Sequence, residues 1–280
     1  MSNYYCLVAE LPDAQFDGSV PAFTVERFRE EVYPLLSATD ARLVDLFFLV
    51  KDNENILEIL RKGENAVITQ VGRYSHAELS EIIASAKNGD TPIKGVPRYI
   101  YDFIEFYTQN ENSENILWAD VMNAHYYNYA TSCANKFVAG WFTFNRDVNN
   151  ILAAMAARKY KMNVADVVVG DGEVAECLRT SGARDFGLSG TFEYIEQLQR
   201  MCENSKLQER EHQLDELRWR WLDDNSVFNY FTIERLFVFL VKLGIVERWA
   251  KLDAEKGMEC YKAIIADLKS GMEIHSMIVK

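Results

Sequence analysis

The longest run of hydrophobic positions lies near the C-terminal end of the chain, at residues 231–249 (FTIERLFVFLVKLGIVERW). Residues 236–241 are uninterrupted hydrocarbon, but Arg235 and Lys242 bracket them. A membrane-spanning helix needs about 20 mostly apolar residues and disfavours charges near its centre. We therefore predict no membrane span here. At about 100° per residue the two cations share one narrow stripe, so the segment is predicted to be a helix buried on most of its circumference.

The remaining pattern predicts a mainly helical chain. All five prolines precede Arg98, and long helices are expected after it because proline breaks helices. Thr24 and Asp40 are candidate N-caps. Two short strands are predicted near the N-terminus, at residues 4–9 and 66–71. Helices are predicted at residues 24–36, 40–48 with an extension to 60 after a break near 52–53, 99–108, 115–136, 147–161, 191–203, 207–222 and 254–268, with consecutive helices meeting near 140–141 and loops at 88–95 and 182–190.

The predicted fold class is mainly all-α, a multi-helix bundle of up to three related helical units with minor irregular or strand content near the N-terminus. The predicted units are residues 1–114, 115–205 and 206–280, with one continuous domain as the alternative. Helix starts at Thr39, Asp147 and Thr232 share a rhythm, in which a polar or acidic residue leads to Arg or Asn and then two apolar residues. This rhythm is compatible with a repeated helical unit.

Composition and charge narrow the classes of function. The chain has 280 residues, 49% of them hydrophobic and 26% charged, with a net charge of −12. This balance is typical of a folded globular protein, and the acidity argues against a nucleic-acid partner, which needs clustered cations. Five dispersed cysteines without a C-x-x-C pair argue against a disulfide framework or a zinc site. With no signal-peptide pattern at the N-terminus, we expect a cytoplasmic protein.

Two motifs suggest chemistry, and for each a structural interpretation is favoured. Gly170-x-Gly172-x-x-Ala175 follows three valines and imitates a dinucleotide fingerprint. A helix-forming segment precedes it where a βαβ unit is needed, so we predict an interhelical turn. Glu209 and His212 have the E-x-x-H spacing of di-iron bundles. His212 falls opposite the predicted core seam of α-helical positions 207, 214, 217 and 221, which favours a solvated helix face.

Two aromatic clusters have both structural and functional interpretations. Residues 125–129 (HYYNY) are expected to pack their rings at the edge of a core. Residues 218–221 (RWRW) form either a partner-binding hot spot or a packed set of amphipathic stems. Acid pairs such as 30–31 and 223–224 are expected at helix ends or on the surface. The sequence assigns no catalytic, cofactor-binding or metal-binding residue, and no cofactor.

Several of these segments resemble one family. Residues 147–151 (DVNNI), followed by Arg158-Lys159 and the turn at 163–172 (NVADVVVGDG), resemble the D-x-x-N-L…R helix of the C-subunit family of V/A-type ATPases, which is called the d-subunit family in eukaryotes. Residues 234–236 (ERL) are similar to the family's recurring E-x-x-N-L-R helix. On this resemblance the chain is a divergent bacterial member.

The resemblance covers mainly residues 115–270, and the N-terminal YYCLVAELPD resembles an uncharacterised bacterial family whose genes accompany V-type ATPase operons. It implies a non-catalytic, all-helical protein of three related units on the cytoplasmic face of the membrane. The implied partners are the rotor shaft and the membrane ring, between which the protein transmits torque and so supports transport of protons or other ions. It implies no insertion into the bilayer. A helical metal-carboxylate enzyme and a generic helical scaffold are the alternatives.

Overall fold

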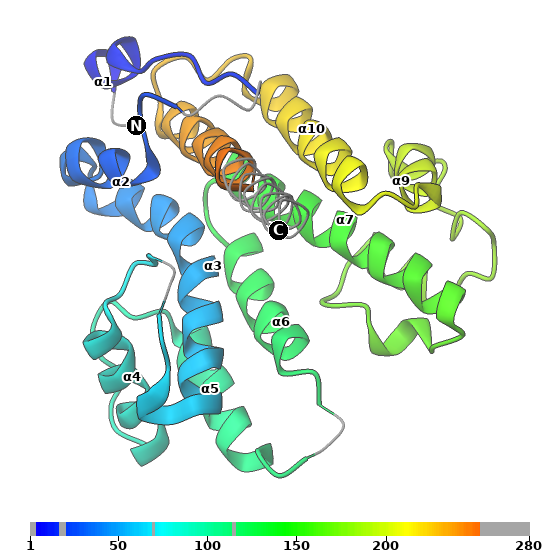
Figure 1. Ribbon diagram of the computed structural model, residues 1–280, viewed down its shortest axis with the longest axis horizontal. Coiled ribbons are helices and arrows are strands. Elements are labelled where there is room, and N and C mark those ends of the chain that lie inside the picture. The colour runs from blue at the N-terminus through cyan, green and yellow to red at the C-terminus, as the bar shows by residue number, and fades with distance from the viewer. Residues whose placement is uncertain (1–3, 17–20, 69–70, 114–115, 253–280) are drawn as a thin grey trace, which may run out of the picture. The chain divides into compact units, whose positions relative to one another are not determined.

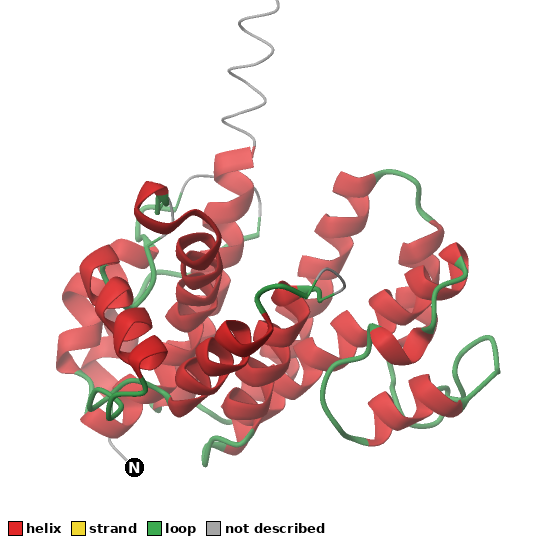
Figure 2. Cartoon of the chain, turned by 90° about the horizontal axis from the view of Figure 1, so that it is seen from below, coloured by secondary structure: helices red, strands yellow, loops and turns green. Residues whose placement is uncertain are grey.

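The computed structural model describes residues 4–16, 21–68, 71–113 and 116–252 (Figure 1). These residues form helices and loops, and no strand occurs among them (Figure 2). The predicted all-α class is therefore confirmed. The helix predicted at 254–268 lies outside the described residues.

Contacts within the chain group it into two units. Unit 1 combines residues 1–37 with 229–280, and unit 2 spans 38–228. The boundaries predicted from the sequence, at 114/115 and 205/206, are different, and the division into three units stays a prediction. Each unit is described separately below.

Unit 1 begins with α1 (Tyr5–Glu10), where a strand was predicted. That prediction is wrong: the backbone N–H of Val8 donates to the carbonyl of Tyr4 at 2.9 Å, which is a helical turn. A short apolar run has no periodicity that separates the two structures. Thr24 caps α2 (Val25–Arg27) as predicted, since its side chain accepts from the N–H of Arg27. The chain continues through the π-helical turn η1 (Phe28–Val32) and the 3₁₀ turn η2 (Tyr33–Leu35).

The long apolar segment of unit 1 is a helix at residues 233–252. Its burial confirms the prediction, because Leu236, Phe237 and Leu240 are fully buried. Phe239 packs against Phe23, with ring centroids 5.6 Å apart. None of the helices in the described part of the chain combines the length and the hydropathy of a membrane span.

Unit 2 contains the longest helices. In chain order they are α3 (Ala38–Lys62), the 3₁₀ turn η3 (Gly63–Asn65), α4 (His76–Asn88), α5 (Arg98–Asn110), α6 (Trp118–Thr131), α7 (Lys136–Tyr160), the 3₁₀ turn η4 (Val164–Asp166), α8 (Glu173–Thr180), α9 (Ile195–Glu203) and α10 (Leu207–Ser226). The helix α4 packs on α3 and α5, and α6 packs on α3, α5 and α7. In the second half, α7 contacts α8, α9 and α10.

Three predictions in unit 2 are wrong. The break near residues 52–53 does not exist, because α3 runs through Asp52 and Asn53, which are both buried. The helix predicted from Asp147 begins at Lys136, and Gly140 lies inside it. Asn135 caps this helix by accepting the N–H groups of Phe137 and Val138. The predicted strand at 66–71 is loop at 66–68 and at 71, and residues 69–70 lie outside the described part.

The same order of elements occurs twice in unit 2. The series α3-η3-α4-α5-α6 is followed by α7-η4-α8-α9-α10, and α3 and α7 are both 25 residues long. In each series the first helix packs on the last. The two long helices also share a motif, Asp-x-x-Asn-Ile-Leu, at residues 52–57 (DNENIL) and 147–152 (DVNNIL). Unit 2 therefore has two halves with the same order of elements and one shared motif.

This correspondence replaces the one expected from the starts of the helices. By its position after the helix start, Arg42 corresponds to Asn150, but Arg42 is the fifth residue of α3 and donates to the carbonyl of Ala38 at 3.2 Å. Asn150 lies in the middle of α7. Its counterpart by sequence is Asn55, because each is followed by Ile-Leu.

Candidate functional site

The shared motif holds the loop that follows each long helix. In α7 the side chain of Asn150 is 3% exposed and forms two hydrogen bonds with the backbone of Val169. Its Nδ2 donates to the carbonyl at 2.8 Å, and its Oδ1 accepts the N–H at 2.9 Å. The N–H and the carbonyl of Val169 are thus both paired by one side chain, which fixes the path of the loop.

In α3 the aspartate of the motif holds the backbone of the loop that follows. The fully buried carboxylate of Asp52 accepts the N–H of Arg73 at 2.8 Å and that of Tyr74 at 3.2 Å. Gly72 makes this approach possible, since a Cβ at that position would lie 2.0 Å from Oδ1 of Asp52. Arg73 also forms an ion pair with the buried Asp45 at 3.2 Å. The loop therefore packs directly on the middle of α3.

Unit 1 contains a contact of the same kind. Oε1 of Glu247, in the helix at 233–252, accepts the N–H of Val25 at 2.6 Å. Glu247 is the fifteenth residue from Ile233, as Asp52 is from Ala38 and Asn150 from Lys136. Three long helices thus carry, at one position, a side chain that holds the backbone of another segment.

The glycine motif of residues 170–175 forms the turn that was predicted between helices. It connects η4 to α8, and the residues before it are not a strand. Gly170 and Gly172 have φ angles of +72° and +139°, which favour glycine. Both lie against Arg146, because a Cβ would come within 3.3 Å and 3.1 Å of its side chain. The guanidinium of Arg146 in turn donates to Oδ1 of Asp147 at 3.0 Å.

Burial governs the electrostatics of this turn. It raises the pKa of the Asp147 carboxyl even though Arg146 lowers it. Arg179 adds two further bonds, donating to the carbonyls of Val168 and Gly170 at 2.9 Å and 2.8 Å. The start of the turn is thus held by side chains at residues 168 and 170, and the interpretation as an interhelical turn is confirmed.

Arg158, the arginine of the resemblance, holds the loop predicted at 182–190. Its guanidinium donates to the carbonyls of Ser181 at 2.6 Å and Ala183 at 2.5 Å. It also lies 3.4 Å from the ring centroid of Phe186, a buried residue with a φ of +55°. Burial lowers the pKa of Arg158. Both Asn150 and Arg158 therefore act on backbone groups of this chain.

The segment at 218–221 divides between packing and exposure. Trp221 stacks on Phe144 with centroids 5.2 Å apart and lies 5.6 Å from Trp141. Arg218 donates to Asn145 at 3.0 Å and pairs with the buried Asp215 at 3.0 Å. The side chains of Trp221 and Arg218 therefore pack within unit 2. The hot-spot interpretation is left with the half-buried Trp219 and the exposed Arg220 as residues accessible to a partner.

The histidine and tyrosine cluster packs as predicted. Tyr126 is buried and its hydroxyl donates to the carbonyl of Leu46 at 2.7 Å. Tyr129 stacks on Tyr99 with ring centroids 5.2 Å apart. His125 packs edge-on against Phe103, at a centroid distance of 6.1 Å. Burial lowers the pKa of His125, and Asp102 raises it.

The E-x-x-H pair lies on a solvated face, as predicted. The side chain of His212 is 44% exposed, and its Nδ1 lies 3.3 Å from Glu216. Glu209 pairs instead with Lys206 at 2.6 Å. The predicted core seam is correct at Leu214 and Leu217, whereas Leu207 is exposed. Within the described residues, no three side chains of His, Cys, Asp or Glu are grouped as metal ligands.

Unit 1 exposes an aromatic surface. We define it as Tyr5, Tyr230 and Phe231, with Tyr5 57% and Tyr230 64% exposed. The rings of Tyr5 and Phe231 lie 4.6 Å apart. The two chain segments that carry these rings are connected by a backbone hydrogen bond, in which the N–H of Tyr4 donates to the carbonyl of Phe231 at 2.9 Å. No residue of α1 is buried, although its sequence YCLVAE is almost entirely apolar.

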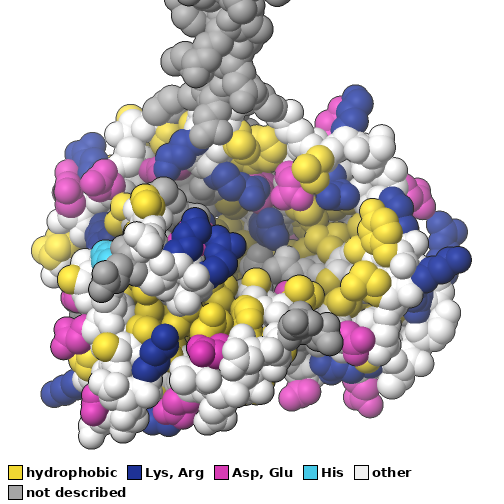
Figure 3. All heavy atoms as spheres, turned by 60° about the horizontal axis from the view of Figure 1, so that its bottom comes forward, with side chains coloured by type: hydrophobic (Ala, Val, Ile, Leu, Met, Phe, Trp, Pro, Cys, Tyr) yellow, Lys and Arg dark blue, Asp and Glu magenta, His cyan; other side chains and the backbone are white. Residues whose placement is uncertain are grey.

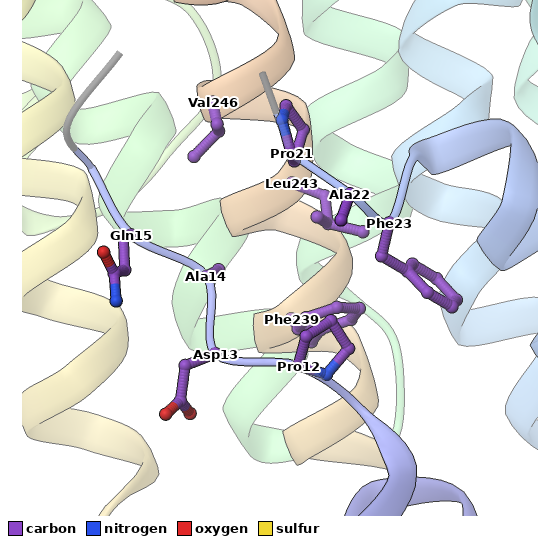
Figure 4. Close-up of a pocket in the computed structure, with 10 residues that line it drawn as sticks. All are labelled: Pro12, Asp13, Ala14, Gln15, Pro21, Ala22, Phe23, Phe239, Leu243 and Val246. Carbon is purple, nitrogen blue, oxygen red and sulfur yellow. The ribbon is translucent and has the colours of Figure 1, made fainter. Parts of the chain in front are cut away.

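A small apolar pocket lies elsewhere in unit 1 (Figure 4). Its volume is about 140 Å³, and the side chains of Phe239, Leu243 and Val246 form its helical wall. Residues 12–15 and 21–23 form the opposite wall. Among the described residues of the lining, Asp13 is the only one with an ionisable side chain, and the others are mostly apolar.

The outer surface mixes charges with apolar side chains. On the face drawn in Figure 3, acidic and basic groups are interspersed with hydrophobic ones. At the end of α10, Val227 and Phe228 are exposed next to the acidic Asp223 and Asp224. Exposed apolar side chains of this kind suit contact with another macromolecule.

Comparison with known proteins assigns the family. A family model described as "Protein of unknown function (DUF2764)" matches residues 1–272, nearly the whole chain. The chain belongs to this family. No curated protein and no solved structure matches the chain.

For this DUF2764 member, the residues missed by sequence reasoning are Asp52, Gly72 and Glu247. The first could have been found from the repeated Asp-x-x-Asn-Ile-Leu motif. Gly72 and Glu247 carry no local signal, because their partners lie 20 residues away or at the other end of the chain.

Proposed function

We propose that the chain is a non-catalytic subunit of a V/A-type rotary ATPase, which couples the central rotor shaft to the membrane ring and so supports ion transport. The supporting observation is the repeated Asp-x-x-Asn-Ile-Leu helix. Residues 147–151 and Arg158 carry the resemblance to the C-subunit family, and residues 52–57 repeat the motif in the matching helix of the first half.

The packing of the motif is compatible with an adaptor that transmits torque. Asn150 and Arg158 fix loops of the second half, and Asp52 fixes a loop of the first. An element that passes torque needs loops that stay on their helices under load. Partly buried contacts in which a side chain pairs backbone groups supply this resistance, since opening one leaves polar groups unpaired. In this proposal the chain lies at the cytoplasmic face of the membrane without entering the bilayer.

The test is purification of the ATPase through a tag on a shaft or ring subunit. We expect the chain in fixed stoichiometry with that subunit after a high-salt wash. Deleting its gene is expected to lower ion pumping per ATP hydrolysed or to dissociate the shaft from the ring. Restoring the gene provides the control. An intact complex that lacks the chain and pumps normally contradicts the proposal.

A scaffold in another assembly is the second candidate. The aromatic surface of unit 1 favours it, because Tyr5, Tyr230 and Phe231 suit any apolar partner. A tag on the chain itself distinguishes the two candidates. Recovery of a different stoichiometric complex, without ATPase subunits, supports the scaffold.

A further inference from the structure

The C-terminal end of α7 presents two large apolar side chains that alternate with lysines. Tyr160 is 70% exposed and Met162 is 54% exposed, and Lys159 and Lys161 are exposed beside them. The ammonium group of Lys159 lies 5.9 Å from the ring centroid of Tyr160. We define residues 159–162 as the lysine–tyrosine surface. Large apolar side chains grouped in solvent in this way are typical of interaction sites.

The backbone at this end is a tight helix cap that favours glycine. The N–H of Met162 donates to the carbonyl of Ala157 at 2.8 Å, and the N–H of Lys161 donates to that of Arg158 at 3.3 Å, which is the Schellman arrangement. Lys161 has φ +59° and ψ +33°, a left-handed conformation that is unfavourable for a residue with a Cβ. The end of α4 has the same cap, and there Gly89 takes this position with φ +71°. Lysine thus stands at 161 where glycine is more favourable for the fold.

The end of α7 is positively charged in a chain whose net charge is −12. Residues 148–165 contain no acidic residue and three cations, Arg158, Lys159 and Lys161. The loop that Arg158 holds contains one acid, Asp185, whose carboxylate accepts hydrogen bonds within that loop. Within the part of the chain that the structure describes, neither lysine forms an ion pair. Both lysines therefore offer their charge to a ligand.

We propose that the lysine–tyrosine surface docks an acidic segment of a partner protein in which an apolar side chain lies beside carboxylates. The carboxylates pair with Lys159 and Lys161, and the apolar side chain packs on Tyr160 and Met162. A short segment contacts only this surface. An anionic lipid surface extends beyond it and is repelled by the net charge of −12 on the chain. The inference goes beyond the proposed function, because it holds for a partner in either candidate assembly.

The test uses the full chain and a fluorescent amphipathic peptide of leucine and glutamate, with binding followed by anisotropy. A peptide of leucine and lysine with equal length is the control for charge. We expect Tyr160→Ser to weaken binding about tenfold or more, as truncation of an aromatic hot spot does. The matched control is Tyr230→Ser in unit 1, where the tyrosine is 64% exposed, and it is expected to change binding less than about twofold.

The double variant Lys159→Gln with Lys161→Gln tests the charges. It is expected to weaken binding about three- to tenfold at low salt and to flatten the salt dependence. The control is Lys87→Gln, because Lys87 is exposed and precedes Gly89 in α4 by two residues, as Lys159 precedes Lys161 in α7. This control is expected to change binding less than about twofold. Equal binding of the two peptides, or equal losses in a variant and its matched control, overturns the proposal.

The single variant Lys161→Gly separates binding from folding. Glycine relieves the left-handed backbone and removes one cation, so we expect a higher urea midpoint together with binding weakened about twofold or more. Binding equal to that of the wild type overturns the proposal. Binding of the wild type to phosphatidylserine vesicles but not to the glutamate peptide overturns it in favour of a lipid surface. A wild-type dimer in sedimentation that Tyr160→Ser abolishes overturns it in favour of a second copy.

Discussion

Gly72→Ala is the sharpest test of how the loops are held on the long helices. A Cβ at this position lies 2.0 Å from Oδ1 and 2.6 Å from Cγ of Asp52, which is fully buried on α3. The carboxylate must therefore move away from the N–H groups of Arg73 and Tyr74. Two hydrogen bonds to a charged group contribute about 1.5–3 kcal/mol each, and overpacking costs about 1–3 kcal/mol. With partial relaxation, we expect the free energy of unfolding to fall by about 3–6 kcal/mol.

The assay is urea unfolding followed by far-UV circular dichroism, with Gly182→Ala as the matched control. A Cβ at Gly182 meets no atom within 4 Å, so this variant is expected to stay within about 1 kcal/mol of the wild type. In an Asp52→Ala background the carboxylate is absent. Gly72→Ala should then cost only about 1 kcal/mol or less, from the remaining contact with the backbone of residue 52. An equal cost in both backgrounds refutes the reasoning.

Two further variants test the second half and the tyrosine cluster. Asn150→Ala should lower the free energy of unfolding by about 2–4 kcal/mol, because it leaves both backbone groups of Val169 without their partner. The control variant Asn163→Ala loses only exposed hydrogen bonds and should lower the free energy of unfolding by about 1 kcal/mol or less. Equal urea midpoints for the two variants contradict the prediction for Asn150. Burial lowers the pKa of His125 in the folded chain, so stability should fall as pH decreases below its ordinary value of about 6.5. His125→Gln should reduce that loss in thermal unfolding between pH 7 and pH 5, and an unchanged slope contradicts it.

The long apolar helix was predictable because its signal is local. Between Leu236 and Val246 the only charged residue is Lys242, which shares a stripe with Arg235 and so marks the side that reaches solvent. The limits of α3 and α7 were harder to predict. Polar residues at 52–53 were interpreted as a break, although the carboxylate of Asp52 binds backbone groups 21 and 22 residues away. A side chain with a distant partner has the local pattern of a helix end.

Gly140 misled the prediction for a related reason. Glycine disfavours the interior of a helix, and this one was placed near a boundary. In the structure it lies inside α7 against the ring of Trp221, which a Cβ would meet at an ordinary distance of 3.7 Å. The site residues were likewise only partly predictable. The motif at 147–151 is visible in the sequence, whereas its contact with Val169 depends on a loop position that only the fold fixes.

The contacts of the motif explain how one helix design can recur with little sequence identity around it. Asp52, Asn150 and Glu247 bind backbone groups of the held segment, so the side chains of that segment are free to differ between copies. In the first half the motif's aspartate holds the loop and in the second its asparagine does, one helical turn further along the motif. The function of holding is thus retained while the residue that performs it shifts. A search for repeats in this family should therefore align positions along the helix and backbone contacts before residue identities.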